Sequence, residues 1–304
     1  QHRLDGIRFA AAGFTNLTRD HLDYHATLED YFDAKMRLFE ELLPVGAPAV
    51  INADTAFSAE VTARCKARGL KIFSVGKYGT ELKLLSTRRD GFGQQLELQG
   101  AKKTYSVYLP LVGDFQTSNA LVAAGLVLAT GGEETLVMHA LESLQGAKGR
   151  LELVGKSKSG SSIFVDYAHT PDALENALTA LRPYTDGKLV VVFGCGGDRD
   201  KGKRPQMGAI AAKHADRIIV TDDNPRSEDP KTIRAEIFAA CPGAQEIGDR
   251  AKAIRAGVDG LAVGDVLLVA GKGHEEGQTV GNTVIPFSDH DAVRAAIAGE
   301  AYHG

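Results

Sequence analysis

The chain has 304 residues, of which 43% are hydrophobic and 24% charged, and its formal net charge is −4 at pH 7. This composition fits a globular protein with two domain-sized cores, and it gives no electrostatic reason to expect a nucleic acid or an acidic membrane as a partner. Cys65, Cys195 and Cys241 are too few and too far apart for a disulfide framework or a zinc site, which is typical of a cytoplasmic protein. Since no apolar run reaches the roughly 18 residues of a membrane span, we expect no membrane partner.

The first part of the chain predicts a mixture of elements. Apolar residues recur with helical spacing over 27–43, and a strand-like run, AVINAD, follows at 49–54. A hairpin is predicted over 94–109 and a helix over 120–130. We place a domain boundary near Gly149 and Arg150, so that residues 1–150 and 151–304 form two domains.

Lys35 lies on the apolar face of the helix predicted over 27–43, where an ammonium group is unusual. Burial disfavours the charged amine and leaves a neutral nucleophile that can take up carbon dioxide, and the resulting carbamate is an oxygen ligand for a hard divalent cation. The alternative is that the side chain follows the edge of the stripe into solvent. The polar cluster that precedes this helix and includes His21 is either a ligand-binding group or a set of capping and surface residues.

The second part contains four short β-branched apolar runs, at 162–166, 188–193, 216–221 and 265–270, with helical periodicity between them. Strands that are apolar on both faces are typical of a parallel sheet covered by helices. Thr170 with Pro171, and Asp229 with Pro230, place a capping side chain and a proline at the start of a predicted helix. This part is therefore predicted to be a doubly wound α/β domain.

Each of these four strands runs into a polar loop: YAHTPD, GCGGDRDKGKRP, DDNPRSEDP and GKGHEEGQ. In an open parallel sheet the carboxyl ends of the strands share one edge, where ligands bind. Taken singly, a glycine-rich loop is more often a tight connection, and a strand-end arginine is usually solvated. Four such loops together favour a site for an anionic or zwitterionic ligand. Neither GxxxxGK[ST] nor GxGxxG is present, so no motif here independently indicates a nucleotide.

A series of longer strings occurs along almost the whole chain in this order: NLTRDHLDYH, DAKMRLFEE, GDFQTSNALVA, VDYAHTPDAL, FGCGGDRDKGKRPQMG, TDDNPR and VAGKGHE. With them the chain resembles the Mur ligases, and within that family the members that add diaminopimelate to UDP-N-acetylmuramoyl-L-alanyl-D-glutamate. The resemblance implies the end of the family's central ATPase domain over 1–150 and its Rossmann-like, amino-acid-binding domain over 151–304.

The reaction that the resemblance implies is ATP-dependent amide formation in peptidoglycan precursor synthesis. ATP phosphorylates the D-glutamyl γ-carboxylate, and the amine of meso-diaminopimelate attacks the acyl phosphate. Mg²⁺ is the expected cofactor, since the transferred phosphoryl group and the carboxylate are both anionic. A cytoplasmic protein, monomeric at full length, is implied as well.

The resemblance also implies roles for residues of this sequence. Lys35, as a carbamate, and His21 match catalytic and magnesium-binding positions, and Gln1 and Arg3 match contacts to the UDP-linked substrate. The residues that match ATP-binding positions are Asn119, Arg150, Asp166 and His169. The residues that match the diaminopimelate pocket are Arg199, Asp223, Asn224, Pro225, Arg226, Gly271 and Glu275.

Arg226 is the selector in this comparison, because the lysine-adding members of the family lack it. Diaminopimelate differs from lysine by one carboxylate at its far end, which a guanidinium can hold bidentately. Lysine would leave the arginine unpaired, and a site that loses a polar partner in this way rejects the analogue.

The sequence departs from the family in one respect. The family's P-loop, its acidic magnesium ligand and its UDP-binding domain precede the segment that Gln1 begins, so we expect this polypeptide alone to have negligible ligase turnover. Two alternatives stay open: a ligand-binding fragment without catalysis, and a related ligase that adds L-lysine or acts on folate.

Overall fold

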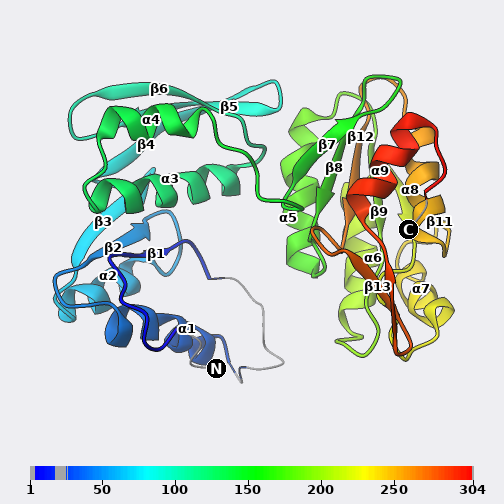
Figure 1. The fold of residues 1–304 in the computed structure, drawn as a ribbon, viewed down its shortest axis with the longest axis horizontal. Helices are drawn as coiled ribbons and strands as arrows, with labels where there is room; N and C mark the ends of the chain where they lie inside the picture. Colours follow the sequence, from blue (N-terminus) through cyan, green and yellow to red (C-terminus); the bar gives the residue numbers. More distant parts are fainter. Residues whose placement is uncertain (1–3, 18–24, 26, 303–304) are drawn as a thin grey trace. The chain divides into compact units, whose positions relative to one another are not determined.

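The computed structural model describes residues 4–17, 25 and 27–302 (Figure 1). These residues belong to two compact units, Gln1–Gln145 and Gly146–Gly304. Gln1, Arg3 and His21, three of the predicted site residues, lie outside the described residues. No helix in the described ranges combines the length and the apolar character that crossing a membrane needs.

The first unit is built on a sheet in the order β1-β2-β3-β4-β5-β6. Neighbouring strands are parallel from β1 to β4, and β4, β5 and β6 are antiparallel. The strands are β1 (Ala12–Phe14), β2 (Pro48–Asn52), β3 (Lys71–Gly76), β4 (Leu82–Asp90), β5 (Gly93–Gln99) and β6 (Thr104–Leu109). The predicted strand at 49–54 and the predicted hairpin over 94–109 are confirmed as β2 and as β5 with β6.

Helices cover both faces of this sheet, as alternate residues of β2 show. Ala49 and Ile51 pack in one core with α1 (Leu28–Arg37) and α2 (Ser58–Ala67), whereas Val50 packs in another with α3 (Asp114–Ala129) and α4 (Glu134–Leu141). The helix predicted over 27–43 is confirmed, although its last part is a π-helix, Leu38–Leu42. The helix predicted over 120–130 begins earlier than expected, at Asp114, because the mostly polar residues 114–119 also belong to it.

The second unit has a sheet in the order β11-β10-β9-β12-β8-β7. The strands are β7 (Glu152–Lys156), β8 (Ser162–Asp166), β9 (Leu189–Phe193), β10 (Arg217–Val220), β11 (Gln245–Glu246) and β12 (Val266–Ala270). The four predicted strands are β8, β9, β10 and β12, and they are parallel to their neighbours among themselves. The sheet as a whole is mixed, because β7 adds an antiparallel edge strand to β8. A separate hairpin is formed by β13 (Gly277–Val280) and β14 (Thr283–Pro286).

Helices lie on both faces of this second sheet (Figure 1). One face packs on α8 (Arg250–Asp259) and α9 (Asp289–Ala298) through residues such as Val190 and Val192. The other helices are α5 (Pro171–Leu181), the short 3-10 helix η2 (Arg182–Tyr184), α6 (Lys203–His214) and α7 (Pro230–Phe238). Both predicted caps are present: Thr170 Oγ1 accepts from Ala173 N at 3.3 Å, and Asp229 Oδ1 accepts from Lys231 N at 3.1 Å. The doubly wound fold places the loops after β8, β9, β10 and β12 at one edge of the sheet.

Candidate functional site

The loop between β10 and α7 carries the predicted selector residues. Asp223, Asn224 and Pro225 are buried and Arg226 is half-buried. The backbone of Arg226 is left-handed, with φ 52°, which is uncommon for a residue with a side chain. Its Nη1 donates to Gly197 O at 2.8 Å and to Asn224 O at 3.4 Å, so one edge of the guanidinium is tied to the protein.

The glycine-rich loop after β9 packs directly against the selector loop. A Cβ on Gly197 would lie 2.0 Å from Pro225 O, and one on Gly196 would lie 2.7 Å from Arg226 Nη1. Gly197 N donates to Asn224 O at 2.9 Å. These glycines are therefore needed for the close approach of two loops, which is the structural role that a glycine-rich loop most often has.

Arg199 is exposed in this same glycine-rich loop, and its Nη1 donates to Asp198 O at 3.4 Å. Asp198 links the two loops, because its carboxylate accepts from Ser227 N at 3.1 Å and from Ser227 Oγ at 2.7 Å. Arg199 is thus held next to the selector loop through its neighbour, whereas its own side chain is exposed.

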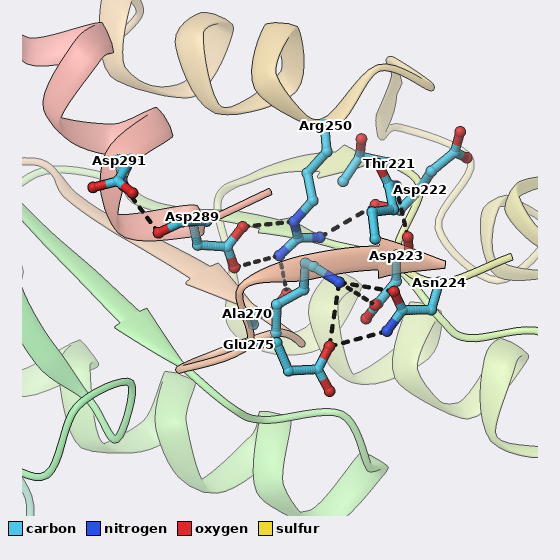
Figure 2. A network of polar contacts seen from close by, with 12 residues as sticks. Thr221, Asp222, Asp223, Asn224, Arg250, Ala270, Glu275, Asp289 and Asp291 are labelled. Carbon is cyan, nitrogen blue, oxygen red and sulfur yellow. Dashed lines mark hydrogen bonds and ion pairs between the residues drawn. The ribbon is translucent and has the colours of Figure 1, made fainter. Parts of the chain in front are cut away.

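The loop after β12 completes the arrangement around Asn224. Glu275 Oε2 accepts from Asn224 Nδ2 at 3.0 Å, which brings two predicted residues into contact (Figure 2). Gly271 has φ 118°, and a Cβ there would lie 2.7 Å from Asp223 Oδ2, so only glycine fits beside that carboxylate. The fully buried Lys272 donates from Nζ to Asn224 Oδ1 at 2.9 Å and to Glu275 Oε2 at 3.2 Å.

Two further features fix these loops, and the sequence analysis did not anticipate either. The hairpin strand β13 lies beside the selector loop: Arg226 N donates to Thr279 O at 3.0 Å, and Gln278 Nε2 donates to Asp223 O at 2.6 Å. The second feature is the fully buried ion pair of Arg250 with Asp289, at 2.7 Å.

Arg250 also connects the bases of the two loops. Its Nη2 donates to Ala270 O at 3.0 Å, just before the loop that carries Glu275. Its Nη1 donates to Asp222 O at 3.4 Å, just before the selector residues. Figure 2 shows this guanidinium between Asp289 and the two carbonyl-bearing residues. A single buried cation therefore supports both loops of the site.

The predicted nucleotide-binding residues of the second unit gather around Tyr167. The guanidinium of Arg150 lies over the Tyr167 ring, 4.7 Å from its centroid, and His169 packs edge-on against the same ring at 4.6 Å. Asp166 accepts from Leu151 N at 2.6 Å and from Ala168 N at 2.7 Å. Burial raises the pKa of the Asp166 carboxyl, although these N–H donors and the charge of Arg150 oppose the shift. The cluster therefore combines an aromatic ring and a cation with a carboxylate that backbone N–H groups hold in place.

The remaining predicted residues lie in the first unit. Asn119 is exposed on α3. Lys35 is half-buried on α1, at the edge of the face formed by the buried Phe32 and Met36, and its Nζ lies 5.0 Å from the centroid of the Tyr31 ring. This position agrees with the edge-of-stripe interpretation of Lys35 rather than with deep burial. Within the described residues, no three His, Cys, Asp or Glu side chains are grouped so as to hold a metal ion.

Comparison with known proteins places both units. Residues 1–127 match the family described as the Mur ligase middle domain, and residues 149–273 match the Mur ligase glutamate ligase domain. The chain belongs to the Mur ligases. The relatives it resembles include proteins of Mesorhizobium japonicum and Bradyrhizobium diazoefficiens. Both are 58% identical to it, over 99% of this chain for the first and 98% for the second. Both are named UDP-N-acetylmuramoyl-L-alanyl-D-glutamate--2,6-diaminopimelate ligase. The chain spans 62% of the length of each.

Solved structures of Mur ligases and their relatives share this fold. A structure titled as a UDP-N-acetylmuramoyl-L-alanyl-D-glutamate--2,6-diaminopimelate ligase is 35% identical with a TM-score of 0.67, over 98% of this chain and 62% of that one. A folylpolyglutamate synthase of Mycobacterium tuberculosis is 22% identical with a TM-score of 0.69, over 88% of this chain and 61% of that one. The second likeness concerns the fold alone.

Sequence reasoning missed several residues of this Mur ligase site. Lys272 belongs to the motif VAGKGHE. A lysine between two glycines does not predict a buried side chain. The β13–β14 hairpin had a usable signal, because QTV and TVI flank Gly281 and Asn282, a typical two-residue turn. The pair of Arg250 with Asp289 had none, since 39 positions separate the two residues.

Proposed function

We propose that this chain provides ATP-binding and amino-acid-binding parts of a ligase that adds meso-diaminopimelate to UDP-N-acetylmuramoyl-L-alanyl-D-glutamate. The names of the relatives at 58% identity support this proposal. In the reaction, the γ-phosphoryl group of ATP passes to the D-glutamyl carboxylate and ADP leaves. The amine nitrogen then attacks the acyl carbon, phosphate leaves, and the nitrogen loses a proton to give the amide. Because ATP and nucleotide-linked precursors are cytoplasmic metabolites, we also propose that the protein is cytoplasmic. We further propose that the full-length protein is a monomer, which sedimentation would test.

The amino-acid assignment rests on the conformation and the contacts of Arg226. The left-handed backbone and the hydrogen bonds of Nη1 hold the Arg226 guanidinium in one position. Among the described residues, no carboxylate forms an ion pair with it. A half-buried guanidinium held in this way is prepared for a carboxylate of the ligand. Glu275, joined to Asn224, provides the opposite charge for the distal ammonium. An end group with both a carboxylate and an ammonium fits this pair better than lysine.

The nucleotide assignment rests on the cluster around Tyr167. The guanidinium of Arg150 is a cation suited to a phosphate group. Asp166 accepts hydrogen bonds from the N–H groups of Leu151 and Ala168, which fix the start of the loop after β8. Asn119 on α3 is the residue assigned to the adenine. These assignments follow the family resemblance, and titration of the chain with a fluorescent ATP analogue tests them: replacement of Arg150 by methionine must weaken binding.

Mg²⁺, when bound, offsets the negative charge of the phosphates and the carboxylate. Lys35 is assigned to this ion by the family resemblance, and its amine would have to lose its proton and take up carbon dioxide before it could act as a ligand. As a carbamate it would offer the oxygen atoms that a hard cation prefers. His21 is assigned to the same ion by the resemblance.

The test of the amino-acid assignment is a pair of calorimetric titrations, with meso-diaminopimelate and with L-lysine. We expect the wild-type chain to prefer meso-diaminopimelate and Arg226→Ala to lose most of that preference. Hydrogen bonds to charged groups contribute about 1.5–3 kcal/mol, which corresponds to roughly a 10- to 150-fold loss. Arg294→Ala is the matched control, because Arg294 is an exposed arginine that pairs with Asp291 on α9. Equal affinities of the wild-type chain for the two ligands would refute the assignment.

A further inference from the structure

Lys272 is a fully buried lysine that has no assigned role in the proposed reaction. Its Nζ faces three acceptors: Asn224 Oδ1 at 2.9 Å, Glu275 Oε2 at 3.2 Å and Asp223 Oδ1 at 3.5 Å. The first two contacts are hydrogen bonds, and the third is an ion pair. Since the side chain has no exposed surface, a ligand in the site has no direct contact with Lys272.

The first effect of Lys272 is on the orientation of Asn224. The amide oxygen accepts from Lys272 Nζ and from Thr279 N, both at 2.9 Å, so both of its lone pairs are used. The amide nitrogen donates one hydrogen to Glu275 at 3.0 Å. The group that Asn224 can still offer to a ligand is therefore the second N–H, a donor suited to a carboxylate. Without Lys272 the amide could turn and offer an acceptor instead.

The second effect is on the net charge of the site. Asp223 and Glu275 bring two negative charges, and Lys272 and Arg226 bring two positive ones, so the four side chains together are neutral. The distal end of diaminopimelate carries one ammonium and one carboxylate and is also neutral. The distal end of lysine carries only the ammonium. Loss of the Lys272 charge would leave the site with one surplus negative charge, which favours a cation.

We propose that Lys272 is a positioning residue that makes the proposed site selective for a zwitterionic end group over a cationic one. It acts by fixing the N–H of Asn224 toward the ligand and by balancing the carboxylates of Asp223 and Glu275. The inference rests on the proposed function, since selectivity has meaning only if the site binds an amino acid of this kind.

The test compares meso-diaminopimelate and L-lysine by calorimetry on the wild-type chain, Lys272→Met and Lys213→Met. Methionine matches the volume of lysine without its charge. Lys213 is the control, because it is an exposed lysine that pairs with Glu175. We expect Lys272→Met to weaken diaminopimelate binding relative to lysine binding by roughly tenfold or more, which equals about 1.4 kcal/mol. Lys213→Met is expected to keep the wild-type ratio.

A double variant covers the case in which Lys272→Met does not fold. Lys272→Met with Asp223→Asn removes one charge of each sign, restores the neutral balance, and is expected to recover part of the preference. An unchanged ratio in Lys272→Met overturns the inference, and so does an equal loss of both ligands, which would mean that Lys272 only supports the fold. If Lys272→Met does not fold, a double variant that shows no preference overturns it as well. A wild-type chain that prefers neither ligand would instead refute the proposed function, and the inference would fall with it.

Discussion

Replacing Asp289 with asparagine measures what the buried ion pair contributes to the second unit. Asp289 and Arg250 are both fully buried, and the guanidinium donates to the two carboxylate oxygens at 2.7 Å each. Asparagine keeps the volume but removes the charge, so Arg250 stays buried without an anionic partner. Breaking a buried pair in this way costs about 3–5 kcal/mol. At about 2–4 °C per kcal/mol for a unit of this size, the expected fall in Tm is roughly 6–20 °C.

The matched control lies two positions further along the same helix. Asp291 forms an exposed pair with Arg294 at 3.0 Å, so Asp291→Asn removes the same charge from α9 at the surface. Its expected cost is below about 1 kcal/mol. Thermal and urea unfolding, followed by circular dichroism at neutral pH, give both values. Equal losses in the two variants would refute the reasoning.

A double replacement separates the charge from the hydrogen bonds of Arg250. Arg250→Met with Asp289→Leu removes both charges and leaves an apolar pair, which is often tolerated. The carbonyls of Ala270 and Asp222 nevertheless lose their donor, at about 1–3 kcal/mol for each group left unpaired. We therefore expect the double variant to recover only part of the stability lost in Asp289→Asn.

Two further predictions concern titration and carbamylation. Hydrogen bonds from Arg204 and from Asp198 N lower the pKa of Glu228 from 4.5 to about 2, so its stabilising effect is complete above about pH 4.5 and disappears as the pH falls toward 2. The urea midpoint should accordingly fall less between about pH 5 and pH 3 in Glu228→Gln than in the wild type, and an equal fall would contradict this. With ¹³C-bicarbonate, a carbamate carbonyl signal is expected in the wild type and in the exposed control Lys66→Arg, but not in Lys35→Arg, because a guanidinium stays protonated. A signal that persists in Lys35→Arg would assign the carbamate to another residue.

The strands and caps of the second unit could be predicted because local sequence determines them. Apolar runs such as 162–166 are recognisable without knowledge of their neighbours, and Thr170 with Pro171 starts a helix by its own chemistry. The antiparallel edge strand β7 was not predicted, because its residues are partly buried or exposed and lack a continuous apolar run. Parallel order among the four central strands followed from their apolar character on both faces.

Within the site, the sequence was informative about which loops meet and uninformative about what supports them. The strand-end rule places Asn224 and Glu275 at one edge of the sheet, and they are in contact. The burial of Lys272 and the pair of Arg250 with Asp289 depend on contacts between distant segments, which no local pattern encodes. These supporting contacts decide where the charges of the site lie, so its selectivity had to be argued from the structure.

Gly149 limits where the second unit can be separated from the first. Its φ is 68°, and a Cβ there would lie 2.4 Å from Gly273 C and His274 N, so its backbone fits against the loop that carries Lys272. Gly149 N also donates to Glu152 at 2.7 Å. A protein engineer who excises this unit, or grafts it onto another ligase, should therefore place the junction upstream of Gly149. A later junction would remove the segment that packs against the loop carrying Lys272.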